Sequence, residues 1–117
     1  MTKSPKEQAK HFLDIILESL NEDKAEDIVV IDMDEKSDFT HYMVVSTGRS
    51  SRHVTATANN IVDRLKKEGR TEVGVEIGKG DWALVDAHDV VVHIFREETR
   101  ALYNIEKIWD VTLASRV

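Results

Sequence analysis

The fold of this chain is decided by the stretch Tyr42-Met43-Val44-Val45-Ser46-Thr47-Gly48-Arg49-Ser50-Ser51. Its first half is rich in apolar and β-branched residues, as is typical of a strand. Gly48 has no Cβ and permits a tight turn. The serines after it are favoured caps for the N-terminus of a helix. The stretch therefore predicts a strand, a glycine turn and a capped helix, in that order.

The helix after this turn is predicted to extend almost to Gly69. Its apolar residues recur with the 3.6-residue period of a helix that packs one face on a core. Two lysines follow, and Gly69 then takes the place of a C-terminal cap. The residues of the stripe are Val54, Ala58, Ile61, Val62 and Leu65.

A first helix and a first strand are predicted upstream. Ser4-Pro5-Lys6-Glu7 is typical of a helix start, with Ser4 as the N-cap and Pro5 at the first helical position. The segment from Asp27 to Asp32 is a short β-branched run that predicts a buried strand, and a polar turn from Asp34 to Thr40 follows it. The apolar stripe of the helix consists of Ala9, Phe12, Leu13, Ile16 and Leu20.

Three more strands and a last helix complete the chain. The last two strands are expected to form a hairpin, and the helix from Glu97 to Trp109 is expected to break near Tyr103-Asn104. The element order is helix, strand, strand, helix, three strands, helix, which predicts an α/β (α+β) fold with a mixed five-stranded sheet flanked by helices. The three strands span Val73 to Ile77, Trp82 to Asp86 and Asp89 to Arg96.

Composition restricts the class of protein. The chain has 117 residues, 41% of them hydrophobic, and no segment rich in proline, glycine or serine, so we expect one domain over residues 1–117. It has no cysteine, which excludes disulfides and thiolate metal sites. Because no apolar run approaches the length of a signal peptide or membrane span, we expect a cytoplasmic protein with no membrane partner.

Charge is unevenly distributed along the chain. The 16 basic and 22 acidic residues give a net charge of −6, which argues against a nucleic-acid coat protein. Ten acidic residues and two lysines between Asp14 and Asp38 give a local net of −8. Six basic and two acidic residues between Arg49 and Arg70 give +4. This asymmetry favours docking onto a charged partner or a second copy, although solvated helix and turn faces are the simpler explanation.

One pair of residues suggests an enzyme. Asp32 and Asp34 point to the same side of an extended segment, a spacing that can hold Mg²⁺ in a nucleotidyltransferase. The Gly48–Ser51 turn could then cradle a phosphate. However, such enzymes place the carboxylates after the glycine turn, and here they precede it. A metal-dependent nucleotidyltransferase therefore remains the alternative. We expect no metal site or cofactor, because the five histidines have no ligand spacing: His11, His41, His53, His88 and His93.

Aromatic residues suggest a protein-binding surface. Trp82 opens a strand directly after a turn, and Tyr103 and Trp109 belong to the last helix, so all three are expected near one end of the sheet. Trp and Tyr are frequent anchors of protein interfaces. Closure of the core is the competing explanation for each of them. The segment from Asp86 to Asp89 is most simply a hairpin turn capped by aspartate side chains.

Three motifs in the same order resemble the bacterial ribosomal silencing factor family, and the similarity runs from about Lys6 to Asp110. The first is the Thr47-Gly48-Arg49-Ser50-Ser51-Arg52-His53-Val54 helix start. The second joins Asp81-Trp82 and Val85-Asp86 to Asp89-Val90-Val91-Val92-His93-Ile94-Phe95. The third is Arg100-Ala101-Leu102-Tyr103-Asn104-Ile105-Glu106-Lys107-Ile108-Trp109.

The resemblance implies a nucleotidyltransferase-like fold without catalysis and a translational repressor. It implies binding to the large ribosomal subunit through ribosomal protein L-fourteen, which blocks the small subunit from joining when nutrients are scarce. A homodimer is also implied, and no direct DNA binding is expected. Relative to the family pattern, Ala87 and His88 are departures, as are His41 and Ile77. The residues that the resemblance places at the partner surface are Trp82, Asp86 and Ala87, with His93, Phe95, Arg100 and Tyr103 as neighbours.

Overall fold

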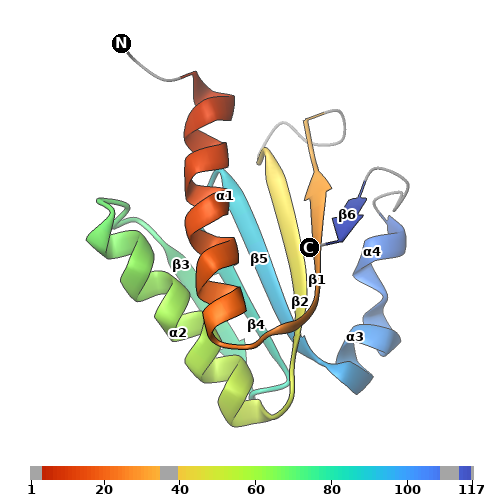
Figure 1. Ribbon diagram of the computed structural model, residues 1–117. Coiled ribbons are helices and arrows are strands. Elements are labelled where there is room, and N and C mark those ends of the chain that lie inside the picture. Colours follow the sequence, from red (N-terminus) through yellow and green to blue (C-terminus); the bar gives the residue numbers. More distant parts are fainter. Residues whose placement is uncertain (1–3, 35–39, 109–113, 117) are drawn as a thin grey trace.

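Two long helices lie side by side on one face of a twisted sheet (Figure 1). The computed structural model describes residues 4–34, 40–108 and 114–116. The helices are α1 (Pro5–Glu22), α2 (Ser51–Lys67), α3 (Glu97–Tyr103) and α4 (Ile105–Ile108). The strands are β1 (Glu26–Asp32), β2 (Tyr42–Gly48), β3 (Gly74–Gly78), β4 (Trp82–Asp86), β5 (Val90–Arg96) and β6 (Ala114–Arg116).

Within the described residues the sheet has the strand order β3-β4-β5-β2-β1-β6. Strands β2 and β5 pair in parallel, and every other neighbouring pair is antiparallel. The α+β fold with a mixed sheet and the predicted β4–β5 hairpin are therefore confirmed. The predicted strand number was one too low, because β6 adds to the outer side of β1. Its three residues, Ala-Ser-Arg, are too few and too polar to show a strand pattern.

Local signals placed the helix boundaries correctly. Ser4 Oγ accepts a hydrogen bond from the Glu7 N–H at 3.2 Å, and Ser50 Oγ accepts one from the His53 N–H at 3.0 Å. Asn104 lies in the left-handed region at φ 46° and separates α3 from α4, which confirms the predicted break. Trp109, the predicted end of this helix, lies outside the described residues.

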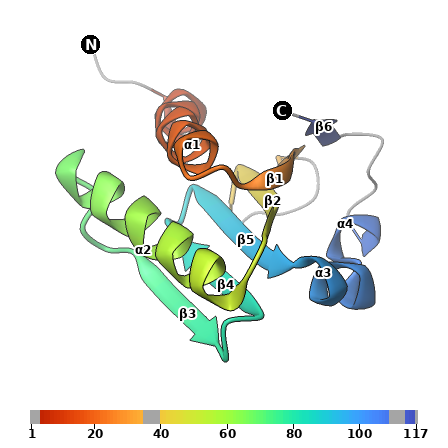
Figure 2. The ribbon, with the colours of Figure 1, turned by 60° about the horizontal axis from the view of Figure 1, so that its bottom comes forward.

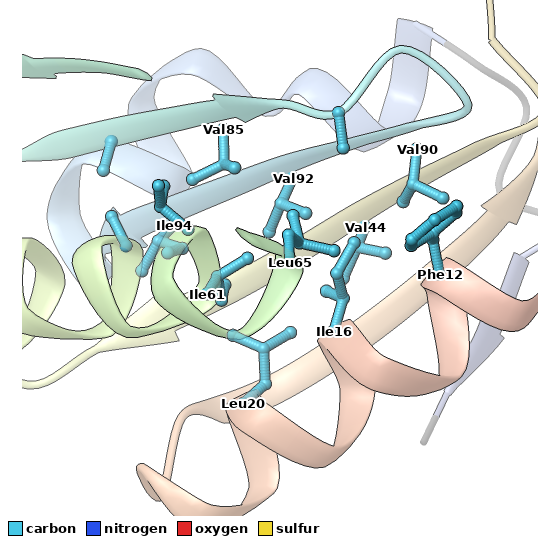
Figure 3. Packing of buried hydrophobic residues seen from close by; sticks show 14 of the residues in the cluster. Phe12, Ile16, Leu20, Val44, Ile61, Leu65, Val85, Val90, Val92 and Ile94 are labelled. Atoms are coloured by element: carbon cyan, nitrogen blue, oxygen red, sulfur yellow. The ribbon is translucent and has the colours of Figure 1, made fainter. Parts of the chain in front are cut away.

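Each face of the sheet carries a buried cluster. On one face, the apolar stripes of α1 and α2 pack onto alternate residues of β2, β4 and β5, as Figure 3 shows for Ile16, Ile61 and Val92. We call the other side the open face. Trp82 and Ile105 pack against its smaller cluster, which consists of Val29, Ile31, Met33, Met43, Val45 and Phe95. The open face therefore lies near α3 and α4 rather than under the long helices.

The β4–β5 turn is held by one arginine. The Arg70 guanidinium donates to the Ala87 carbonyl and to Asp89 Oδ2, each at 2.8 Å, and its centre lies 4.1 Å from the Phe12 ring centroid. Asp86 Oδ1 accepts a hydrogen bond from the His88 N–H at 2.9 Å. This capped turn confirms the hairpin interpretation of Asp86 to Asp89.

We expect His88→Gly to raise the free energy of unfolding by about 0.5 to 1 kcal/mol. His88 is exposed and adopts φ 68°, where a Cβ is unfavourable and glycine is not. Urea unfolding of the two proteins measures the difference. His88→Ala is the matched control, because it removes the imidazole but keeps the Cβ. Equal stabilisation by alanine would show that the backbone conformation is not the cause.

Candidate protein-binding surface

A groove of about 540 Å³ lies between the β3–β4 hairpin and α3. Trp82 and Leu84 of β4 form its floor. One wall comes from α3, and the other comes from β3 and the turn after it. Apolar side chains dominate the α3 wall and the floor, whereas the β3 wall is charged. The wall residues are Thr99, Leu102 and Tyr103 on one side, and Glu76, Gly78, Lys79 and Asp81 on the other.

Four aromatic rings contact one another at this floor, two pairs of them stacked and two tilted. The Trp82 ring centroid lies 4.9 Å from that of Phe95 and 5.1 Å from that of Tyr103. The His93 and Phe95 rings are nearly parallel, with centroids 5.8 Å apart. Phe95 is fully buried, Trp82 is half-buried and Tyr103 is 55% exposed. The predicted proximity of Trp82 and Tyr103 is confirmed. The exposure of the rings increases from Phe95 through Trp82 to Tyr103, so they connect the core to the surface.

A hydrogen bond fixes the orientation of the tryptophan. Trp82 Nε1–H donates to His93 Nδ1 over 3.1 Å. His93 is 7% exposed, and burial lowers its pKa from 6.5 to about 4. It is therefore neutral near pH 7, as an acceptor at Nδ1 must be. The sequence predicted His93 as a half-buried, hydrogen-bonded strand residue; the structure confirms the strand position and the hydrogen bond, but the side chain is buried rather than half-buried.

Arg100 holds α3 against the sheet. Its Nη1 donates to the Asp27 carbonyl at 2.7 Å and to Thr47 Oγ1 at 2.8 Å. Asp27 has φ 47° and lies in the irregular stretch where the β1–β2 register shifts. This arginine therefore joins the helix that carries Tyr103 to the ends of two strands. No local pattern in the sequence indicates these long-range bonds.

The structure divides the residues predicted for the partner surface into two groups. The first group lies at the groove: Trp82 and Tyr103 line it, and the rings of His93 and Phe95 contact the Trp82 ring. Arg100 lies nearby and bonds α3 to the sheet. Asp86 lies on the same face of β4 but four residues away, about 13 Å along the strand. Ala87, His93 and Phe95 are buried beneath the surface, so they support it rather than form it.

Leu102 is a residue of this surface that the sequence did not predict. It falls in the apolar pattern of the last helix, but it is 78% exposed and lines the groove. A helix of seven residues is too short for apolar spacing to distinguish its buried side from its exposed side. An exposed leucine beside a half-buried tryptophan is the combination expected of a binding surface.

The paired aspartates lie elsewhere. Lys6 Nζ contacts Asp32 Oδ2 at 3.1 Å and Asp34 Oδ2 at 2.7 Å, and His41 Nδ1 lies 2.7 Å from Asp34 Oδ1. The hydrogen bond from Lys6 lowers the pKa of Asp34, and the one from His41 adds to this effect. An ammonium group therefore lies between the two carboxylates, where the transferase hypothesis expected Mg²⁺.

The other feature of the transferase hypothesis is far from this pair. Asp32 pairs with Tyr42 at one end of β2, whereas Gly48 lies at the other end, about 20 Å away. In the described part of the chain, no group of three His, Asp or Glu residues is arranged to hold a metal ion. The geometry therefore gives this hypothesis no support.

The uneven charge is partly satisfied within the fold. Arg64 of α2 forms ion pairs with Glu18 and Glu22 of α1, and Asn60 donates to Asp23 Oδ2 at 2.8 Å. The acidic stretch and the basic helix thus contact each other where α1 and α2 pack. Over the residues with assigned positions, no helix is both long and apolar enough to span a membrane.

Comparison with known proteins identifies relatives over most of the chain. Residues 6–116 match the family described as ribosomal silencing factor during starvation. The silencing factor of Zymomonas mobilis is 40% identical over 99 residues, which cover 84% of this chain and 74% of that protein. A mouse protein named mitochondrial assembly of ribosomal large subunit protein 1 is 35% identical over 88% of this chain and 47% of its own length. A crystal structure from Chromobacterium violaceum has a TM-score of 0.82 at 36% identity, covering 86% of this chain and 84% of that one.

Proposed function

Because the chain belongs to the ribosomal silencing factor family, we propose that it represses translation by binding the large ribosomal subunit and blocking the small subunit from joining. The observation that carries this proposal is the groove with its aromatic floor. Its accessible apolar side chains are Trp82 on β4 and Leu102 and Tyr103 on α3, and aromatic side chains of this kind are frequent anchors of protein interfaces. A steric mechanism requires only such a surface, with no cofactor and no catalysis.

We further propose that the protein partner on the subunit is ribosomal protein L-fourteen. The chain carries a net charge of −6, and acidic side chains of Glu76 and Asp81 lie at the rim of the groove. Such a surface attracts a basic protein and repels the phosphates of ribosomal RNA. The name of the mouse relative also refers to the large ribosomal subunit. We place the activity in the cytoplasm, in a single domain that forms a homodimer.

Sedimentation with isolated subunits tests the proposal. We expect the purified protein to sediment with large subunits and not with small subunits. Adding it before the subunits are mixed is expected to reduce the fraction of joined ribosomes. Addition of free L-fourteen is expected to release the protein from the large subunit. Binding without any effect on subunit joining would refute the steric mechanism, and absence of binding would refute the proposal as a whole.

The nucleotidyltransferase alternative gains no support from the geometry. Lys6 already forms ion pairs with both Asp32 and Asp34, and the two aspartates lie at the opposite end of β2 from the glycine turn. A nucleotide with Mg²⁺ is therefore expected to leave the melting temperature of the protein unchanged, since a ligand that does not bind the folded state cannot stabilise it.

A further inference from the structure

Strand β3 is an edge of the sheet with an open outer side (Figure 2). Among the described residues its single neighbouring strand is β4. All five residues of β3, from Gly74 to Gly78, are exposed. Natural proteins usually protect such an edge with lysine, proline, a bulge or a covering helix, because an open edge pairs readily with another chain. Strand β3 contains no lysine and no proline, and its register with β4 is regular.

The two sides of β3 differ in chemistry. Val75 and Ile77 lie opposite the core residues Val85 and Ala83, so they share the face that is covered by α2, yet each is 37% exposed. Glu76 lies opposite Leu84, on the open face. Directly opposed residues of paired strands share a face. In a strand added to the outer side of β3, side chains would alternate between the two faces of the sheet. Those beside Val75 and Ile77 would complement an apolar surface, and the one beside Glu76 would complement a carboxylate.

The glycines on either side of Glu76 are not required by the fold. Neither Gly74 nor Gly78 has a left-handed φ. A Cβ on Gly78 would meet nothing within 4 Å, and one on Gly74 would make only an ordinary contact of 3.7 Å with Asp86 Cβ. Glycine weakens a strand and often marks a place where another backbone approaches closely. Here the glycines leave space on both sides of a single carboxylate, along the outer edge.

We propose that β3 binds an extended segment of a partner protein as an additional strand, and that this segment carries a basic residue between two apolar residues. Main-chain hydrogen bonds supply affinity in this mode, and alternate side chains supply specificity. The basic side chain pairs with Glu76 in the space left by the glycines, and the apolar ones cover Val75 and Ile77. The edge shares Glu76 and Gly78 with the wall of the groove. Strand addition uses the outer backbone of β3 and not the aromatic floor, so its test by β3 amide exchange is separate from the test of the proposed function.

The same residues argue against a second copy of this chain as the occupant. Symmetric antiparallel pairing centred on β3 would place two Glu76 carboxylates opposite each other, and like charges directly opposite destabilise a strand pair. The chemical complement of an acidic, glycine-flanked position is a basic side chain. The partner segment is therefore expected to come from a different protein.

Amide hydrogen exchange tests this proposal with defined peptides. The probe is a capped peptide of alternating valine and lysine, and its matched control alternates valine and glutamate. At a free probe concentration about ten times its Kd, we expect the exchange of the outward-facing β3 amides to slow by about tenfold. The control peptide is expected to leave them unchanged. Glu76→Lys is expected to reverse this preference.

A second variant separates binding from folding. Gly78→Thr places the side chain of a good strand former in open space, so we expect a melting temperature that is equal to or higher than that of the wild type, and at least about tenfold weaker binding of the valine and lysine peptide. The proposal is wrong if the β3 amides gain no protection, or if both peptides protect them equally. It is also wrong if the peptide perturbs only Trp82 and Tyr103. Protection that rises with protein concentration in the absence of peptide would identify a second copy as the occupant and overturn the proposed partner.

Discussion

Trp82→Ala is expected to weaken binding to the large ribosomal subunit by more than about 2 kcal/mol, which corresponds to an increase in Kd of about thirtyfold or more. The indole lies at the floor of the groove, stacks on Phe95, contacts the tilted Tyr103 ring and is oriented by its hydrogen bond to His93. Its loss removes the aromatic anchor from the floor of the groove. Calorimetry with purified L-fourteen, or sedimentation with large subunits, measures the change.

Two further variants make this result interpretable. Tyr103→Ala changes a side chain that is 55% exposed on the wall of the groove, so it is expected to reduce binding with little effect on folding. Lys10→Ala changes an exposed residue of α1 that pairs with Asp14, and it is expected to change neither. Unchanged affinity of a folded Trp82→Ala protein would exclude the groove as the binding surface. Urea unfolding of each variant verifies that the comparison is made between folded proteins.

The elements that the sequence predicted well are those specified by nearby residues. Ser4 and Ser50 cap their helices through bonds that span three residues, and Asn104 ends α3 by its own backbone conformation. The stripes of α1 and α2 are long enough for their period to identify the buried side. These features depend on interactions between residues that are close together in the sequence, so they can be located from a single sequence.

The features that could not be predicted depend on contacts between distant segments. Arg100 bonds to Asp27 and Thr47, which are 73 and 53 residues away along the chain. The contact of Lys6 with Asp32 joins the start of α1 to the end of β1 over 26 residues. The spacing of Asp32 and Asp34 in the sequence does not indicate this contact. Because Lys6 occupies the position between the two carboxylates, the pair that suggested a metal site is bound to an ammonium group instead.

The candidate site was predictable in part for the same reason. Trp82 and Tyr103 were predicted because Trp and Tyr are frequent interface anchors, and because both lie in the motifs that carry the family resemblance. The exposure of Leu102 and the burial of Ala87 are decided by where α3 and the β4–β5 turn pack, and Arg100 and Arg70 determine that packing. Arg70 thus holds the β4–β5 turn and Arg100 holds α3, although neither arginine is distinguished from other surface charges in the sequence.

Acidification from pH 6.5 to pH 4 is expected to lower the free energy of unfolding by about 3 kcal/mol through His93 alone. Burial lowers the pKa of this imidazole from 6.5 to about 4, so the unfolded chain binds a proton in this interval and the folded chain does not. The contribution is therefore fully present above pH 6.5 and is lost as pH falls through 4. The Trp82 indole loses its acceptor when His93 Nδ1 is protonated, so its fluorescence is expected to change over the same acidic range.

Urea unfolding of the wild type and of His93→Gln at a series of pH values isolates this contribution. Glutamine cannot titrate, yet its side-chain oxygen can still accept a hydrogen bond from Trp82. The difference between the two unfolding free energies is expected to change with pH between 6.5 and 4, at a slope approaching about 1.4 kcal/mol per pH unit. The lowered pKa of Asp34 destabilises both proteins equally in acid and therefore cancels in the difference. Parallel curves would mean that His93 takes up its proton as readily in the folded protein as in the unfolded chain, and the buried hydrogen bond could not be what orients Trp82.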